Sequence, residues 1–296
     1  MRIHALLLSL SFIAAVTRVP LSAQQTPIAS DADERQLLHQ SADWALIAPH
    51  LPDPATASEA QLEMAGGVLQ ARRFPEDALD YYQYALRRGG DPVTLMKKMG
   101  VVRLELRQNM LARTIFQQCV HMSKKDSQAW NNLAAADYSM GRYLDSIGEY
   151  KHAVKLNKRS AVYHANLGMA YFTNGDVTSA QSEFATAVRL DPRIMDPQNS
   201  GGITLHVLQT QNYGKLCFEI AKLYARQGDI PETELWLQKA AEHGLDLRDA
   251  LNNDAEMRVW LKNAEIRVLL INTARLQKHG AGAIPTLGPD TESVPD

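Results

Sequence analysis

The sequence predicts an all-α fold, an array of helix pairs stacked one on the next. The main observation is a period of 34 residues: four blocks follow one another from Glu59, Val93, Ser127 and Ala161, and a fifth begins at Gly214 after an interruption. A second observation is that three positions in every block hold only small residues. A third is the composition, because 45% of the 296 residues are hydrophobic and only two are cysteine. This composition is typical of a protein held together by its core and excludes a scaffold built on disulfides.

The residues of each block predict two helices that cross closely. Positions 4, 7, 8 and 11 share one face of a first helix, and positions 20, 24 and 27 share one face of a second. Small residues let the helices approach, bulky residues at position 24 fill the space beside the crossing, and glycine at position 15 suits a left-handed turn between the helices. The small residues are Gly66, Gly100, Ala134, Gly168 and Ala221 at position 8, and Ala78, Ala112, Ser146, Ala180 and Thr233 at position 20. At position 27 they are Ala85, Cys119, Ala153, Ala187 and Ala240. The bulky residues at position 24 are Tyr82, Phe116, Tyr150, Phe184 and Leu237.

These blocks resemble the tetratricopeptide repeat family, and the resemblance extends over all five blocks. Only His164 departs from the pattern in the fourth block, while Arg103 and Asp137 stand where a tyrosine is common in the second and third. The resemblance implies a right-handed α-α superhelix, or solenoid, of about five helix pairs with helical caps; an unrelated helical bundle is the alternative. The fourth block agrees with the family at Leu167, Gly168, Tyr171, Gly175, Ala180, Phe184, Ala187 and Pro192.

The first residues are typical of a signal peptide. Arg2 supplies a positive start, residues 5–16 are an apolar run, and Leu21-Ser22-Ala23 forms an acceptable cleavage site. The run is too short to span a bilayer, which needs about 20 apolar residues. We therefore expect export to a periplasm or the exterior after cleavage near Ala23, with no stable membrane anchor. The alternative is a buried amino-terminal helix.

The remaining boundaries follow from the period and from composition. We expect a loose segment and an amino-terminal capping helix before the first block, carboxy-terminal capping helices after the fifth, and a disordered tail rich in proline and glycine. The predicted parts are 1–23 signal peptide, 24–58 loose segment and cap, 59–194 four contiguous repeats, 195–213 insertion, 214–247 fifth repeat, 248–277 capping helices and 278–296 tail.

The insertion at 195–213 has its own pattern. Turn-forming residues from Pro197 to Gly202 open it, and Ile203, Leu205 and Val207 then alternate with polar residues as in a short extended segment. Because solenoids often carry extra chain on the binding side, we expect this segment to limit access to the groove. The alternative is that it only extends the next helix or covers a surface.

Catalytic and metal-binding patterns are absent from the sequence. It contains no phosphate-binding glycine loop, no H-E-x-x-H, no paired C-x-x-C and no G-x-S-x-G turn. Cys119 and Cys217 occupy packing positions three repeats apart, so we expect two buried thiols and no disulfide. A pI near 6.5 does not favour nucleic acid. We expect no enzyme activity, no cofactor and no metal.

The resemblance implies a concave groove formed by the first helices, where family members commonly hold an extended peptide. Asparagine amides can bond to a peptide backbone and lysines attract carboxylates. The terminal-carboxylate clamp of chaperone-binding members is absent, because Val101 and Val162 stand at two of its positions. For Asn132 and Asn166, structural bonding between repeats is the alternative. The predicted groove residues are Lys97, Lys98, Asn131, Asn132, Tyr138, Asn166, Met169, Phe172, Lys215, Phe218, Lys222 and Arg226.

We therefore expect a non-catalytic repeat scaffold that binds a protein or an extended peptide. One alternative is an assembly factor of an envelope complex that uses its convex face. A second, less favoured, is an enzyme accessory whose site lies in the insertion or the caps.

Overall fold

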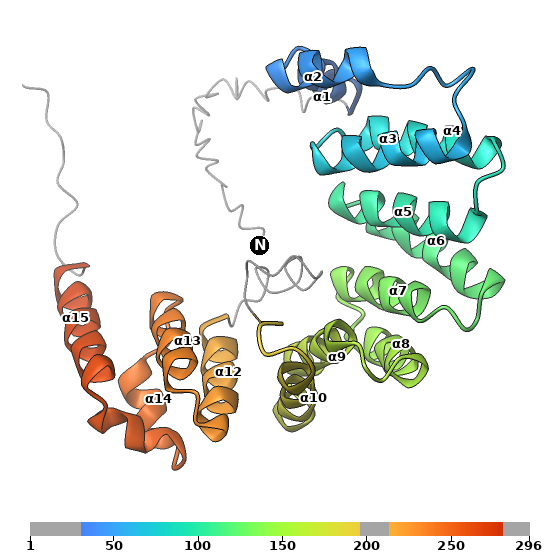
Figure 1. Ribbon diagram of the computed structural model, residues 1–296. Coiled ribbons are helices and arrows are strands. Elements are labelled where there is room, and N and C mark those ends of the chain that lie inside the picture. The colour runs from blue at the N-terminus through green and yellow to red at the C-terminus, as the bar shows by residue number, and fades with distance from the viewer. Residues whose placement is uncertain (1–30, 196–212, 281–296) are drawn as a thin grey trace, which may run out of the picture. The chain divides into compact units, whose positions relative to one another are not determined.

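The computed structural model describes residues 31–195 and 213–280, with side chains from 34 to 195 and from 213 to 272, and every regular element in these ranges is a helix (Figure 1). The all-helical array of helix pairs is therefore confirmed. The chain divides into two compact units, with the division between Leu51 and Pro52. The expected signal peptide, nearly all of the insertion and the tail from residue 281 lie outside the described residues.

The first unit contains α1 (Asp31–Leu38), α2 (Ala42–Ile47) and the 3-10 turn η1 (Ala48–His50). The sequence predicted one capping helix here, and the structure has two short ones instead. Ser41 separates them, because its side-chain oxygen accepts a hydrogen bond from the Trp44 N–H at 3.2 Å and so starts a new helix.

The second unit contains the repeats, and each first helix begins within one residue of the predicted block start. Each helix packs against the other member of its pair, and contiguous pairs pack against one another. The pairs are α3 (Glu59–Ala71) with α4 (Pro75–Arg87), α5 (Pro92–Glu105) with α6 (Asn109–Met122), α7 (Ser127–Ser139) with α8 (Tyr143–Leu156), α9 (Ala161–Thr173) with α10 (Val177–Leu190), and α12 (Tyr213–Gln227) with α13 (Ile230–Glu242).

Short polar side chains fix where the first helices begin. Ser58 and Gln61 form a reciprocal capping box at the start of α3. Asp91, Asp126 and Ser160 cap α5, α7 and α9, because their side chains accept hydrogen bonds from backbone N–H groups in the first turn. In the first four repeats the boundary is therefore specified locally, by one capping residue in each.

The small residues at position 8 lie beneath the aromatic residues at position 24. A Cβ atom added to Gly66 would stand 2.6 Å from the Tyr82 ring, and one added to Gly168 would stand 2.6 Å from the Phe184 ring. No real Cβ tolerates such a contact, so these two repeats require glycine where the paired helices cross. The expected close approach of the two helices is confirmed.

The turn inside each pair uses a left-handed residue at position 15. Gly141, Gly175 and Gly228 have φ values of 76°, 88° and 74°. In the first two repeats the same position is Arg73 with φ 65° and Arg107 with φ 57°. The turn geometry is thus common to all five repeats, although only three of them have the residue that adopts it freely.

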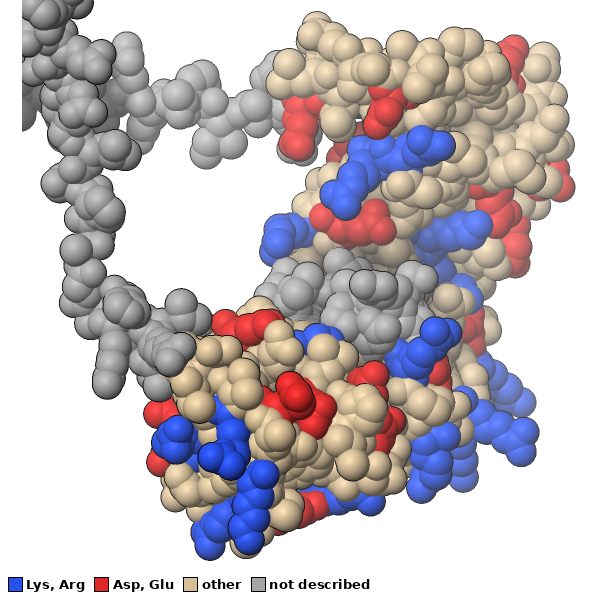
Figure 2. All heavy atoms as spheres, turned by 60° about the vertical axis from the view of Figure 1, so that its left-hand side comes forward, with Lys and Arg blue, Asp and Glu red and all other residues tan. Residues whose placement is uncertain are grey.

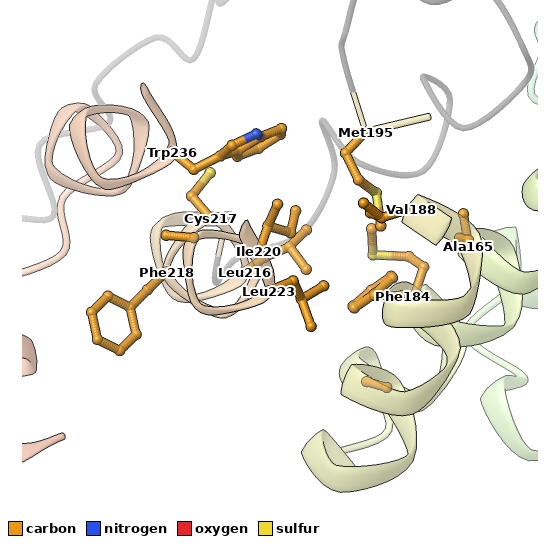
Figure 3. Packing of buried hydrophobic residues seen from close by; sticks show 14 of the residues in the cluster. Ala165, Phe184, Val188, Met195, Leu216, Cys217, Phe218, Ile220, Leu223 and Trp236 are labelled. Carbon is orange, nitrogen blue, oxygen red and sulfur yellow. The ribbon is translucent and has the colours of Figure 1, made fainter. Parts of the chain in front are cut away.

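Packing continues from the fourth repeat to the fifth despite the interruption between them. Figure 3 shows Leu216, Ile220 and Leu223 of α12 facing Val188 and the other buried residues around α10. The Tyr224 hydroxyl also donates to the Pro192 carbonyl at 2.8 Å. Repeats four and five therefore share one hydrophobic core.

The carboxy-terminal elements are α14 (Leu247–Asn253), η2 (Met257–Lys262) and α15 (Ala264–Gly280). Leu251, Met257, Ile266 and Leu270 bury their side chains in the same core as α12 and α13. Helix α15 runs three residues into the segment expected to be a disordered tail. Among the described helices, none combines the length and the apolar character needed to cross a bilayer.

Candidate partner-binding site

The predicted groove residues all lie on the first helices of repeats two to five. The structure brings three asparagines together, buries two apolar members in the core and pairs most of the cations. They are distributed as Lys97 and Lys98 on α5, Asn131, Asn132 and Tyr138 on α7, Asn166, Met169 and Phe172 on α9, and Lys215, Phe218, Lys222 and Arg226 on α12.

Asn131, Asn132 and Asn166 form a chain of amides across α7 and α9. The Asn166 Nδ2 donates to Asn131 Oδ1 at 3.0 Å, and the Asn131 Nδ2 donates to Asn132 Oδ1 at 3.3 Å. Asn131 is 9% exposed and Asn166 is 3% exposed, whereas Asn132 is half-buried. The bonding between repeats that the sequence left as an alternative is therefore present for Asn166.

The two ends of this amide chain carry unused hydrogen-bonding capacity. Asn166 Oδ1 is buried and accepts no hydrogen bond from any described residue. At the other end, the Asn132 Nδ2 has no acceptor among the described side chains and backbone groups. The chain of amides thus ends in one acceptor and one donor, the pair of groups that a peptide unit complements.

The apolar and aromatic residues of the predicted groove differ in how far they are buried. Met169 is 2% exposed and Phe218 is 7% exposed, so both belong to the core and present almost no surface to a partner. Tyr138 is also buried, and its hydroxyl lies 2.7 Å from Thr173 Oγ1. Burial raises the pKa of Tyr138, so this phenol stays neutral. Phe172, on the next helix, is half-buried and remains partly accessible.

The lysines of α5 are ion-paired with neighbouring repeats. Lys97 Nζ lies 2.7 Å from Asp126 Oδ2 and donates to Gln128 Oε1 at 3.0 Å. Burial alone would raise the pKa of Asp126, but bonds from Lys97 and from the backbone outweigh it and lower that pKa. Lys98 Nζ lies 2.7 Å from Glu63 Oε1. Lys97 therefore joins the second repeat to the cap of the third.

The cations of α12 bind acids that follow in the chain. Lys222 Nζ lies 2.7 Å from Asp254 Oδ2, and Arg226 makes two bonds with Glu256, at 2.6 and 2.8 Å. Lys215 is exposed and pairs with no described residue. Because most of the predicted groove cations are already neutralised, attraction of carboxylates is not the main property of this face. Figure 2 shows basic and acidic side chains interspersed over one view of the surface.

A buried carboxyl pair that the sequence did not predict lies between α7 and α8. Asp137 is fully buried; its Oδ1 accepts a hydrogen bond from Arg113 Nε at 2.7 Å and lies 3.0 Å from Arg142 Nε, an ion-pair distance. Its Oδ2 and the Glu149 Oε2 are buried without a donor. Burial and the negative charge of Asp137 raise the pKa of Glu149 to about 8, so Glu149 is largely protonated at neutral pH. The signal in the sequence was Asp137 itself, which replaces a common tyrosine.

The two cysteines are buried as expected, and both thiols are free. Burial raises the pKa of Cys119 and of Cys217 to about 11, which disfavours the reactive thiolate. Within the described ranges, the side chains of His, Cys, Asp and Glu form no group of three that could hold a metal ion.

Part of the chain is similar to a known repeat family and to one known protein. Residues 132–193 match the model of the tetratricopeptide repeat. The Photosystem I assembly protein Ycf3 of Rippkaea orientalis is 30% identical over 127 residues, which span 41% of this chain and 66% of that protein.

Two solved structures are similar to this chain, and the first of them, with a TM-score above 0.5, has the same helical fold. Pseudomonas aeruginosa PilF has 16% identity and a TM-score of 0.51, with 76% of this chain and 93% of that one covered. YrrB, described as a TPR protein with an unusual peptide-binding site, has 17% identity and a TM-score of 0.42, with 72% and 97% covered.

Proposed function

We propose that this tetratricopeptide-repeat protein is a non-catalytic scaffold that holds an extended peptide segment of a partner protein against α7 and α9. Proteins of this repeat type bind proteins or peptides. The observation that carries the proposal is the chain of three amides, whose half-buried end, Asn132, has an Nδ2 donor without a described acceptor. At the other end Asn166 Oδ1 is buried without a donor; such an acceptor costs about 1–3 kcal/mol, which a partner's donor would recover once the packing over it opens.

The polarity of the amide chain indicates what it would bind. A peptide unit offers one N–H and one C=O, and the chain ends in one free acceptor on Asn166 and one free donor on Asn132. Half-buried Phe172 adds partly accessible apolar surface on α9. Val101 and Val162 replace residues that would grip a terminal carboxylate. We therefore expect recognition of the backbone within a segment, not of its carboxyl end.

We test this site with the double change Asn132→Ala and Asn166→Ala. Partners are captured from an envelope extract, and peptides from the captured protein then compete for binding. We expect the double variant to lose about tenfold or more in affinity for the competing peptide while its helicity stays unchanged. Asn252→Ala, at an exposed asparagine of α14, is the matched control and should bind like the wild type. Equal affinity of all three proteins would contradict the proposal.

The proposed location is a periplasm or the exterior, on the basis of the signal-peptide pattern in residues 1–23. Mass spectrometry of the protein recovered from cells should find Gln24, or a residue within a few positions, at the amino terminus. Recovery of cytosolic protein that still begins with Met1 would contradict export without affecting the peptide-binding proposal.

A second candidate function is assembly of a larger complex, and the specific observation that favours it is the 30% identity to a protein named for photosystem I assembly. In that case the convex second helices would contact the partner. Charge changes on α8 and α10 would then abolish capture, and competing peptides would not.

A further inference from the structure

The turns that join one repeat to the next carry a concentration of unpaired cations in the middle of the array. Lys124 and Lys125 follow α6, and Lys158 and Arg159 follow α8 at the same positions of the next repeat. All four are exposed, and none forms an ion pair with any described residue. Lys155, near the end of α8, is exposed and unpaired as well.

The backbone of both turns is anchored by a ring from the following helix. The Trp130 Nε1 donates to the Lys124 carbonyl at 3.0 Å, and the His164 Nε2 lies 3.1 Å from the Lys158 carbonyl. Trp130 and His164 occupy the same position of their repeats, and each bonds to the carbonyl at the same position of the preceding turn. The turns have a fixed backbone, while the amino groups of Lys124 and Lys158 stay in solvent.

The two turns are neighbours, and a third helix end extends the row. Ser127 Oγ and the Tyr163 hydroxyl lie 3.3 Å apart, which links the first turns of α7 and α9. Arg189 stands at the end of α10, one repeat after Lys155, and is exposed. The nearby carboxylates are already engaged, Asp126 by Lys97 and Glu183 by His164.

Exposed apolar side chains accompany the cations. Met122, Leu156 and Leu190 are the last residues of α6, α8 and α10, and they are 53%, 38% and 40% exposed. They occupy one position of the repeat, next to the basic positions. We call the set Met122, Lys124, Lys125, Lys155, Leu156, Lys158, Arg159, Arg189 and Leu190 the basic edge.

The pair of cations at positions 32 and 33 occurs only in repeats two and three; the same positions hold Gly90 and Asp91 in the first repeat, Pro192 and Arg193 in the fourth, and Leu245 and Asp246 in the fifth. In the first repeat Arg87 stands at the position of Lys155 and Arg189, with its guanidinium 4.9 Å from the centre of the Tyr84 ring. The whole chain has a formal net charge of −2. The cations are therefore gathered in one place and do not reflect the general composition.

We propose that the basic edge binds the surface of an anionic phospholipid bilayer, reversibly and without insertion of a helix. Lysine and arginine near an anionic membrane surface each contribute to binding, and exposed apolar side chains beside them can enter the headgroup region. An acidic protein segment would need only the cations, whereas the row of exposed Met122, Leu156 and Leu190 fits a lipid interface better. The asparagines of the proposed peptide site lie inside α7 and α9, not in these turns.

The experiment measures sedimentation of the full chain with vesicles of equal parts phosphatidylglycerol and phosphatidylcholine, relative to vesicles of phosphatidylcholine alone. The edge variant carries Lys124→Glu, Lys125→Glu, Lys158→Glu and Arg159→Glu. We expect the part of the binding that depends on phosphatidylglycerol to fall by more than about tenfold and to disappear at high salt. The apolar residues at the start of the chain are the same in all the variants, so their contribution cancels.

A control variant changes the same number of charges elsewhere. It carries Arg72→Glu, Arg248→Glu, Lys262→Glu and Arg267→Glu, all at exposed residues without a described ion-pair partner. We expect it to keep most of the wild-type binding. Equal losses in both variants would show that only net charge matters, and no loss in the edge variant would also overturn the proposal. Circular dichroism and thermal unfolding verify that both variants fold.

Two further measurements complete the test. Met122→Gln removes one exposed apolar side chain without changing charge, and we expect it to weaken vesicle binding by a few fold. Poly-glutamate serves as the acidic-polymer probe. If poly-glutamate binds the basic edge while phosphatidylglycerol vesicles do not, the partner is an acidic chain and the bilayer proposal is wrong.

Discussion

Glu149 shares a buried position with Asp137, and the two carboxyl groups cannot both carry a charge without cost. The nearby titratable and charged groups are Arg113 on α6, Arg142 before α8 and Asp145 within it. The two arginines lie within ion-pair distance of Asp137, and Glu149 keeps its proton because burial and Asp137 raise its pKa to about 8. The protonated Glu149 can then donate to an Asp137 oxygen that otherwise has no donor.

This pair predicts a pH dependence of unfolding. The ordinary pKa of 4.5 is raised to about 8 in the fold, so between these values the folded chain holds a proton that the unfolded chain releases. Stability contributed by Glu149 is therefore complete below pH 4.5 and decreases as pH rises towards 8. Glu149→Gln keeps a donor without a titratable group. We expect it to stabilise the protein by on the order of 1–3 kcal/mol at high pH relative to wild type.

Urea unfolding at a series of pH values measures the effect. The difference between Glu149→Gln and wild type should widen from pH 5 to pH 8. Glu59→Gln, at an exposed glutamate at the start of α3, should show no such widening. A constant difference between Glu149→Gln and wild type across this range would contradict protonation of Glu149 in the fold.

Within one helix pair, the contact between position 8 and position 24 decides how closely the helices approach. Gly168 lies beneath the Phe184 ring, and a Cβ there would also stand 3.2 Å from the Ala180 carbonyl. In the third repeat, Ala134 and Tyr150 occupy the same two positions and are both buried. The third repeat thus accommodates a methyl group at position 8, whereas the fourth repeat, as its helices are packed, does not.

Gly168→Ala should therefore destabilise the array by about 1–3 kcal/mol, although alanine is the better helix former. Gly148→Ala is the matched control, because a Cβ there meets no atom within 4 Å. We expect that change to stabilise by about 0.5–1 kcal/mol. Thermal unfolding of the two variants distinguishes the effects by sign. Equal signs would show that helix propensity, not the contact with Phe184, determines the result.

For the whole molecule, the sequence predicted the helix pairs because the period is repeated five times and every repeat has the same small positions. It did not predict the ion pairs that the groove cations form with Asp126, Glu63, Asp254 and Glu256, because each of these pairs joins residues about one repeat apart. Lys97 binds Asp126 at a separation of 29 residues, and Lys222 binds Asp254 at a separation of 32. A search for acids one period from each groove lysine could have found both.

Burial within the predicted site could not be predicted from the period alone. Met169 and Phe218 share groove positions with more accessible residues of other repeats, but in the structure they are core residues. Which side of a helix becomes buried depends on how neighbouring repeats pack, and Met169 and Phe218 both lie in the core that the fourth and fifth repeats share. Asn166 is buried for a related reason, since its amide bonds to the preceding repeat.

The arginines in the left-handed turns make the array uneven along its length. A residue other than glycine in this conformation costs about 1–2 kcal/mol, and only the first two repeats contain one, Arg73 and Arg107. The array should therefore fray from α3 and α4, and the end distant from the C-terminal helices should be digested first by a protease. Changing Arg73 and Arg107 together to glycine should lengthen the lifetime of that end in limited proteolysis and leave cleavage elsewhere unchanged. The durable part of the molecule would then be its later repeats, and its first repeats would open reversibly while the remainder stays folded.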